Sequence, residues 1–465
     1  MSSQLTASPA RSSGVGTTAE LIAFVENLSW DRLDPEVQHY AKRHLLDTIG
    51  VMIAGSTGQL AVQCESVLCA VRPSGTVPVP GRFRRADVLD ACFLAGAAGH
   101  GIELDDGYRQ GSVHPGVCVV PAALYGSYSR AIAGRRLLES VVLGYEVMTA
   151  LACATHPALR RRGFHPTSVL GVFGAAAAAA RLHGLDTQQI ANALGIAASS
   201  SAGLFAFING GADTKRLHAG HAAREGLQAV LLAVAGVMGP PDVIEGRDGL
   251  FQSFAFGEGL KPAIQWPPQV PFRITDCYIK PYACCRHLQP AVEAFIGLLN
   301  AHGLSENEVE TVQVQTYAIS AEHAHTGWAD YASAQLSFPY IMALGMRYGA
   351  IKPQHFEDST RQDPTMAALC ARVHVEVAAD LDALYPRFRP ARVTVRTKRG
   401  QFVGSAMEAR GCREEPVDDA YLSAKFMDLS GPVLGAVRAR SLLNQLWKLD
   451  RLDDVTPVID RVRPE

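Results

Sequence analysis

The stretch Gly171-Val-Phe-Gly-Ala-Ala-Ala-Ala-Ala-Ala180 consists almost entirely of small residues. A second stretch of this kind, Ala95-Gly-Ala-Ala-Gly-His-Gly101, lies upstream. Because small residues let helix axes approach closely, both stretches are expected to form central, buried helices. Apolar residues recur at helical spacing elsewhere, as between residues 21 and 28. The sequence from about residue 17 to residue 238 therefore predicts an all-α region.

The pattern changes near residue 267, after a segment rich in proline and glycine that stops helices. Thr311–Tyr317 and Ala391–Thr397 alternate apolar and polar residues as strands do, and Lys398-Arg-Gly400 is a turn signal. Residues 420–446 return to helical spacing. Strands mixed with helices indicate an α+β module inserted in a helical domain.

We therefore expect a mainly α fold. Both chain ends form a large all-α helical domain, with residues 19–266 as its N-terminal part and residues 403–465 as its C-terminal part. A smaller α+β lid domain, residues 267–402, is inserted near the C-terminal half, and the cleft between the domains is the natural ligand site. Residues 1–18 are interpreted as a disordered tail.

Composition excludes several classes of function. In 465 residues, 43 Lys+Arg and 45 Asp+Glu give a net charge of −2 without a block of like charges, so no nucleic-acid partner is expected. The sequence has no apolar run of about 18 residues and no apolar leader, so it predicts no membrane span and a cytoplasmic location. The ten cysteines are irregularly spaced, as reduced thiols are. No Walker A loop, GxSxG elbow or dinucleotide fingerprint is present.

The first of four polar clusters lies between two apolar helices. Residues 103–116 hold the carboxylates of Glu103, Asp105 and Asp106, together with Arg109 and His114. A solvated loop with a helix cap is one interpretation. Three carboxylates, an arginine and a histidine exceed what a cap requires, so a functional site is the other interpretation.

The second cluster, residues 160–167, precedes the helix that contains the alanine run. Its three arginines and His165 add positive charge at a helix N-terminus, where backbone N–H groups and the macrodipole favour an anion. A carboxylate substrate would suit this position. The competing interpretation is an N-cap formed by Thr167 with exposed arginines.

The third cluster, residues 209–221, contains Lys215, Arg216, His218 and His221. The chain has only eight lysines against thirty-five arginines, so Lys215 stands out as a candidate base or cation. His218 and His221 have the i, i+3 spacing of metal ligands, but no partner carboxylate or HExxH context accompanies them. Packing on a helix face is therefore favoured, and no metal is expected.

The fourth cluster, residues 280–287, contains Lys280, the adjacent Cys284 and Cys285, and His287. No second Cys/His pair lies at a zinc spacing. These side chains are expected to face the cleft or to be buried as thiols, and a Cys–His nucleophile is a weaker alternative. Together the four clusters favour proton transfer on a small anionic substrate, with a proton abstracted α to a carboxylate and the carbanion stabilised by fixed positive charge.

Motifs in these clusters and elsewhere resemble the MmgE/PrpD family, which includes 2-methylcitrate dehydratase, cis-aconitate decarboxylase and iminodisuccinate epimerase. They span nearly the whole chain in family order. The matching stretches are Leu45–Gly50, Glu103–Asp106, Ser112–Gly116, Gly163–Thr167, Gly171–Ala176, Asp213–Lys215, Leu217–Gly220, Lys280–Tyr282, Cys284–Cys285, Ala334–Tyr340 and Lys425–Phe426.

The resemblance implies a helical domain with an α+β lid, a homodimer, a small carboxylate substrate, and catalysis without an organic cofactor, an iron–sulfur cluster or another metal. By motif position, the implied catalytic residues are Asp106, His114, His165, Lys215 and His287. The implied substrate-binding residues are Arg109, Arg216, His218, Lys280 and Cys285.

The chain departs from the family's decarboxylase and methylcitrate branches at two places. Gly107-Tyr108-Arg109 follows the acidic pair where those branches resemble a Thr-Trp motif, and Cys285 falls where the decarboxylase branch is expected to have histidine. We therefore expect a cofactor-independent, dehydratase-type lyase for a small di- or tricarboxylate. The alternatives are an epimerase of the iminodisuccinate type, a cis-aconitate-like decarboxylase, and a non-catalytic carboxylate binder.

Overall fold

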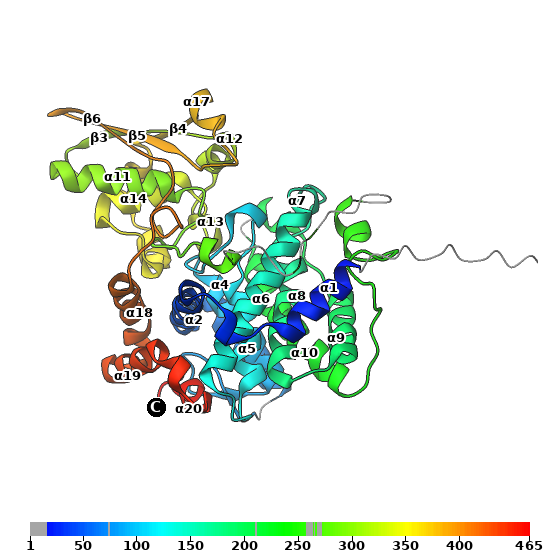
Figure 1. Ribbon diagram of the computed structural model, residues 1–465. Coiled ribbons are helices and arrows are strands. Elements are labelled where there is room, and N and C mark those ends of the chain that lie inside the picture. Colours follow the sequence, from blue (N-terminus) through cyan, green and yellow to red (C-terminus); the bar gives the residue numbers. More distant parts are fainter. Residues whose placement is uncertain (1–15, 73–74, 210–211, 257–263, 265, 267–271) are drawn as a thin grey trace, which may run out of the picture.

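The computed structural model of the protein describes residues 16–72, 75–209, 212–256, 264, 266 and 272–465. Helices dominate these residues, and a four-stranded sheet lies in the C-terminal half (Figure 1). The mainly α fold with a smaller α+β region, expected from the sequence, is confirmed.

Among the described residues of the N-terminal half, the only strands are β1 (Val77–Pro78) and β2 (Arg85–Ala86), which form a short antiparallel ribbon between helices. Its α-helices are α1 (Thr17–Asn27), α2 (Pro35–Gly55), α3 (Gln59–Val71), α4 (Val88–Gly101), α5 (Gly116–Ser127), α6 (Gly134–Thr155), α7 (Ala158–Arg161), α8 (Pro166–His183), α9 (Thr187–Ser199) and α10 (Thr214–Val234).

The two stretches of small residues form the buried helices α4 and α8, as predicted. Helix α10 packs against both of them. A Cβ atom placed on Gly96 of α4 would lie 2.9 Å from the Cα atom of Gly220 in α10. Likewise, a Cβ atom on Gly144 of α6 would lie 2.7 Å from the carbonyl oxygen of Gly174 in α8. Glycine therefore sets the distance between the central helices.

The C-terminal helices return to the N-terminal ones (Figure 1). They are α18 (Asp419–Leu434), α19 (Ala436–Trp447) and α20 (Thr456–Asp460). Helix α18 packs along α2, and Phe426 contacts the position of Gly50. One hydrophobic cluster contains buried residues from positions 21–279 and 417–462, so both ends of the chain build one core.

The sheet has the strand order β4-β3-β5-β6, formed by β3 (Val309–Thr316), β4 (Val373–Val377), β5 (Ala391–Thr397) and β6 (Gly400–Ala406). Strand β3 pairs with β4 in parallel and with β5 antiparallel. Thr397 pairs with Gly400, so the predicted turn at Lys398-Arg-Gly400 joins a hairpin.

Helices α11 (Gln289–His302) and α14 (Phe338–Tyr348) cover one face of the sheet (Figure 1). They enclose a second hydrophobic cluster that includes Phe295, Phe338 and Val393. The remaining helices of this region are α12 (Ala318–Ala321), α13 (Tyr331–Ala334), α15 (Asp358–Arg361), α16 (Pro364–Cys370) and α17 (Ala379–Asp382).

Two of the predicted boundaries can be compared with the structure. Helix α1 begins at Thr17, inside the expected tail, because the backbone N–H of Thr18 donates to Glu245 Oε2 (3.0 Å) and fixes the chain there. The expected end of the lid at residue 402 falls inside β6, since pairing with β5 continues to Ala406. The expected boundary at residue 267 lies outside the described residues.

By length and composition, helix α6 could cross a membrane, and the bent pair of α2 and α3 could form a second span. However, 89% of the apolar window of α6 is buried inside the protein. A core helix of a soluble protein passes the same test, so this feature is weak evidence for a membrane span.

The Gly96–Gly220 contact gives a first prediction. Gly96→Ala should lower the free energy of unfolding by about 1–3 kcal/mol, because the added methyl group also meets the Val117 carbonyl oxygen at 2.8 Å. Gly101→Ala, at the end of the same helix, is the control, because no atom lies within 4 Å of its Cβ position. Urea unfolding of both variants measures the difference, and equal stability would contradict the packing described.

Candidate active site

The first polar cluster forms an acidic turn after α4. Glu103 has a φ of 52°, a left-handed conformation that costs a non-glycine residue free energy. Its carboxylate binds both Lys215 and Lys280, and these ion pairs hold the conformation. Gly107 exchanges two backbone hydrogen bonds with Tyr278, of 3.1 and 2.8 Å. The turn is therefore fixed beside the segment that carries Lys280.

Three of the chain's eight lysines meet at this turn. Lys280 is fully buried, and its Nζ atom lies 3.2 Å from both Glu103 Oε2 and Asp105 Oδ1. Lys425, from α18, donates to the carbonyl oxygens of Leu104 (3.2 Å) and Lys280 (2.9 Å). Buried charges require partners, and here each ammonium group has a carboxylate or carbonyl partner.

The two lysines that bind Glu103 differ in their acidity. Burial lowers the pKa of Lys280, but Asp105, Tyr278 and Cys285 together outweigh this effect and raise the pKa above its usual value. Burial, and then the positive charge of Lys280, lowers the pKa of Lys215 to about 7, and the charge of Cys285 acts in the opposite direction. Lys280 is thus a fixed cation, and Lys215 exchanges a proton near neutral pH.

Two histidines share the carboxylate of Asp105. Nδ1 of His100 lies 2.8 Å from Asp105 Oδ2, and Nδ1 of His114 lies 3.2 Å from the same oxygen and 2.7 Å from the carbonyl oxygen of Asp106. These oxygens are acceptors, so Nδ1 of each ring carries the proton, and Nε2 is the acceptor nitrogen of the neutral ring. His114 is partly exposed, and its Nε2 can accept a hydrogen bond.

Burial and charge fix the protonation states of this group. Burial lowers the pKa of His100 to about 3, so its ring is neutral at physiological pH. Burial raises the pKa of Asp105, but the charge of Lys280, the electrostatic effect of His114 and the hydrogen bond of His100 hold it well below its usual range. Asp105 is therefore a buried carboxylate held between a cation and two imidazole N–H groups.

His165 and His218 extend this group of rings. His165 forms the N-cap of α8, stacks on His100 with ring centres 6.0 Å apart, and lies 2.9 Å from His218 between the two Nδ1 atoms. Thr167 is the second residue of α8, so the competing interpretation, in which Thr167 forms the N-cap, is wrong. Burial lowers the pKa of His165 well below its usual value.

Lys215 also connects the histidine group to Cys285, with which it interacts electrostatically. The Sγ atom of Cys285 lies 4.0 Å from Nε2 of His323, and Lys215 interacts electrostatically with both side chains. His287 accepts or donates a 2.5 Å hydrogen bond with the Tyr317 hydroxyl, and its ring stacks on His323 at 6.5 Å. The fourth cluster therefore meets the third one through Lys215.

Two predicted residues lie in the walls of the site. Arg216 bonds to the carbonyl oxygen of Gly101 (3.1 Å), to Asp213 (2.7 Å) and to Gln335 Oε1 (2.6 Å), so α10 is tied to α4 and to the lid. Arg109 binds Glu408 (2.5 Å) and Glu414 (3.2 Å), and these partners connect the acidic turn to the segment after β6.

Asp106 points away from the lysines. Its Oδ1 accepts the N–H of Gly116 (2.9 Å), and its Oδ2 accepts the hydroxyl of Tyr145 (2.6 Å) and lies 2.8 Å from Nδ1 of His44. The structure brings His114, His165, His218, Lys215, Lys280 and Cys285 together, with His287 beside His323. Asp106 and Arg109 lie outside this group: Asp106 contacts α2, α5 and α6, and Arg109 contacts the segment after β6.

Models of two known domains match nearly the whole chain. The MmgE/PrpD N-terminal domain matches residues 19–263, and the MmgE/PrpD C-terminal domain matches residues 282–450. The chain belongs to the MmgE/PrpD family. This result confirms the family resemblance inferred from the motifs.

Curated relatives of this MmgE/PrpD protein include cis-aconitate decarboxylases and 2-methylcitrate dehydratases. It is 27% identical to cis-aconitate decarboxylase of Aspergillus terreus over 472 residues, which cover 96% of this chain and 95% of the relative. It is 26% identical to the Homo sapiens enzyme of that name, with coverage of 94% and 92%. It is 23% identical to 2-methylcitrate dehydratase of Escherichia coli strain K12 over 367 residues, with coverage of 73% and 72%.

Sequence reasoning did not select five residues of this MmgE/PrpD site. Glu103 and Asp105 were visible in the acidic cluster, and the scarcity of lysine could have singled out Lys425 as it did Lys215. His100 lies within a run of small residues that indicated only packing. His323 lies on a short 3-10 helix, η6 (Glu322–His325), far from the other motifs, so only the folded chain brings it to Cys285.

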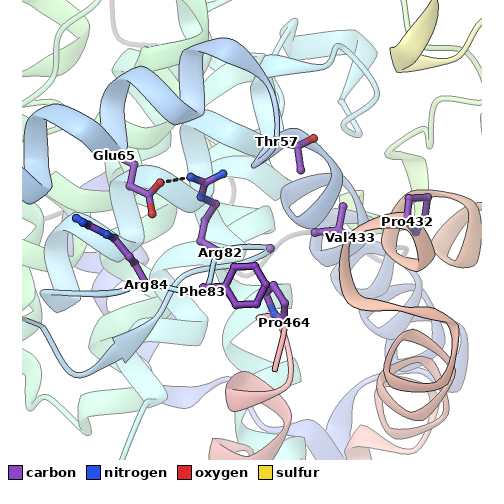
Figure 2. A pocket seen from close by; sticks show the side chains of 9 residues that line it. Thr57, Glu65, Arg82, Phe83, Arg84, Pro432, Val433 and Pro464 are labelled. Atoms are coloured by element: carbon purple, nitrogen blue, oxygen red, sulfur yellow. Dashed lines mark hydrogen bonds and ion pairs between the residues drawn. The ribbon is translucent and has the colours of Figure 1, made fainter.

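Solvent reaches one side of the cluster. The side chains of Lys215 and His114 are each 16% exposed, and Cys285 and His323 are half-buried. A separate cavity of about 570 Å³ lies between the loop at residues 81–84 and α18, where Arg82 is paired with Glu65 (Figure 2). None of the clustered histidines or lysines lines that cavity, so the open side of the cluster is the better candidate for chemistry.

His100, Asp105 and His114 offer three ligand atoms within 4.8 Å of one another, a spacing that could hold a metal ion. In the structure Nδ1 of His100 is hydrogen-bonded to Asp105, Nδ1 of His114 is hydrogen-bonded to the carbonyl oxygen of Asp106, and Lys280 lies 3.2 Å from the other oxygen of Asp105. The ammonium group supplies the positive charge that a metal would bring and would repel a cation. The donor set therefore fits a hydrogen-bonded group better than a metal site.

Metal independence remains a prediction. Prolonged treatment with EDTA, followed by removal of the chelator, should leave kcat and KM unchanged, because Lys280 already neutralises Asp105. The measurement is a turnover assay before and after chelation, with added zinc and iron in parallel. A loss of activity that either metal restores would contradict this account of His100, Asp105 and His114.

Proposed function

We propose that this MmgE/PrpD protein is a lyase that acts on a small di- or tricarboxylate by removing a proton α to a carboxylate. The observation that carries the proposal is the convergence of Lys215, Lys280 and the group of histidines on one acidic turn, with solvent access on one side. Such an array binds an anion and exchanges protons with it. The names of the relatives, which refer to aconitate and methylcitrate, support a carboxylate substrate.

In this proposal Lys215 is the general base. A pKa of about 7 leaves a large neutral fraction at physiological pH, which is the condition under which a lysine takes a proton efficiently. The C–H bond breaks, its electron pair remains on the carbon, and the charge spreads into the adjacent carboxylate. The fixed charge of Lys280 stabilises this carbanion. Nε2 of His114 accepts a hydrogen bond from a substrate hydroxyl group.

Dehydration follows if the carbanion expels hydroxide from the neighbouring carbon and an acid converts the hydroxide to water. This is our first candidate reaction. Decarboxylation is the second candidate, and a specific observation favours it: the cis-aconitate decarboxylases match 94–96% of this chain, whereas the 2-methylcitrate dehydratases match 72–73%. In that reaction a C–C bond breaks, carbon dioxide leaves, and the carbanion takes up a proton.

Product analysis distinguishes the two reactions. The purified protein should convert at least one of citrate, 2-methylcitrate or cis-aconitate. Dehydration is indicated if proton NMR shows a new vinyl signal and the product has lost no carbon. Formation of carbon dioxide from cis-aconitate indicates decarboxylation. Turnover of none of these acids, nor of iminodisuccinate, would contradict the proposed lyase.

Replacement of Lys215 tests its role as the base. Lys215→Met and Lys215→Arg should each lower kcat by about 10² or more, because arginine keeps the charge but cannot lose its proton. His165→Gln should have a similar effect through loss of the His165–His218 contact. For the wild type, kcat/KM should rise with pH through about 7, as Lys215 loses its proton.

Lys398→Met, in the exposed turn between β5 and β6, and His221→Gln, on the exposed side of α10, are matched controls. Both should retain wild-type kcat. A loss of less than tenfold in the Lys215 or His165 variants would remove the corresponding residue from the mechanism. The expected homodimer also stays a prediction, which light scattering of the purified protein would check.

A further inference from the structure

Cys285 and its neighbour Cys284 have opposite surroundings. Cys284 is fully buried, and burial raises the pKa of its thiol. Cys285 is half-buried, and its Sγ atom lies 4.0 Å from Nε2 of His323. The backbone N–H of His287 also interacts with the Cys285 sulfur. Two donors therefore face one sulfur atom, and Lys215 adds a positive charge nearby when it carries its proton.

The backbone fixes both members of this contact. The N–H of Cys285 donates to the carbonyl oxygen of Gln335 (3.1 Å), and the carbonyl oxygen of Cys285 accepts from Leu288 (3.0 Å). His323 is held on η6, and its ring stacks on that of His287 at 6.5 Å. The sulfur and the imidazole are thus preorganised and lie on the partly exposed side of the cluster.

We infer that Cys285 and His323 form a thiolate–imidazolium pair that supplies the second proton-transfer group of this site. The inference rests on the proposed function, because Lys215 takes a proton from the substrate and an acid must return one. The N–H bond of the His323 imidazolium breaks, its electron pair stays on Nε2, and in the dehydration the proton bonds to the departing hydroxide, which leaves as water. In a decarboxylation the carbanion forms by loss of carbon dioxide, no proton passes to Lys215, and the carbanion takes the proton of His323, which water then replaces. Cys285 is the positioning residue that keeps His323 protonated before this step.

The charges around the pair agree with this assignment. Although burial raises the pKa of the Cys285 thiol, the hydrogen bond and positive charge of His323, together with Lys215, lower it to about 6. Burial lowers the pKa of His323, but the thiolate more than offsets this and raises it. The other titratable or charged groups that interact with the pair are Lys280, Cys284, Glu322, His287 and Tyr317.

The first part of the test is a thiolate titration, which does not require a substrate. The thiolate absorbance near 240 nm of the wild type minus that of Cys285→Ser, recorded from pH 4 to pH 9, should show one thiolate that titrates near pH 6. His323→Gln should move this titration upward toward the usual cysteine value of about 8.5. Cys64→Ser, on α3, is the control and should leave the absorbance between pH 5 and pH 8 unchanged, because burial raises the pKa of Cys64. Absence of the thiolate below pH 8 in the wild type would overturn the pair.

The second arm measures kinetics. His323→Gln should lower kcat by about 10² with a smaller change in KM, and Cys285→Ser should lower kcat and move the alkaline limb of its pH profile to lower pH. Circular dichroism and the Tm of each variant report folding. If the wild type shows the thiolate but both variants keep the wild-type kcat, the pair exists and only its role in proton transfer is overturned. If the wild type shows the thiolate but turns over none of the acids, the proposed function is overturned, and the role in proton transfer with it.

Discussion

The site depends on one buried cation. Lys280 has no exposure to solvent, and an unpaired ammonium group in that position would be strongly destabilising. Glu103 and Asp105 neutralise it at 3.2 Å each, and this requirement fixes the shape of the turn that carries them. The left-handed backbone of Glu103, the two histidines on Asp105 and the position of Lys215 all follow from this arrangement.

The same ion cluster joins distant parts of the chain. Glu103 and Asp105 follow α4, Lys215 begins α10, and Lys280 belongs to the segment that enters the α+β region. Lys425 comes from α18 and closes the group by donating to the carbonyl oxygens of Leu104 and Lys280. Close glycine contacts between α4 and α10 bring the first two parts together. Packing of the helical core therefore positions the groups of the site.

The sequence predicted the architecture well, because that information is local. Runs of small residues identified α4 and α8, and alternation identified β3 and β5. Motif position identified Lys215, Lys280, His114 and His165, which the structure brings together. Pairing in space was not predictable. The contact of Cys285 with His323, 38 positions away, and the opposite directions of Asp105 and Asp106 depend on tertiary packing.

Deuterium exchange tests the central claim most directly. Proton NMR in D₂O, with a panel of small di- and tricarboxylates, follows the loss of C–H signals next to a carboxylate. The account predicts that the wild type and Lys398→Met place deuterium at such a carbon of at least one acid, and that Lys215→Met does so about 10² times more slowly. No exchange with any acid in the wild type, or equal exchange in Lys215→Met, would contradict proton transfer by this cluster.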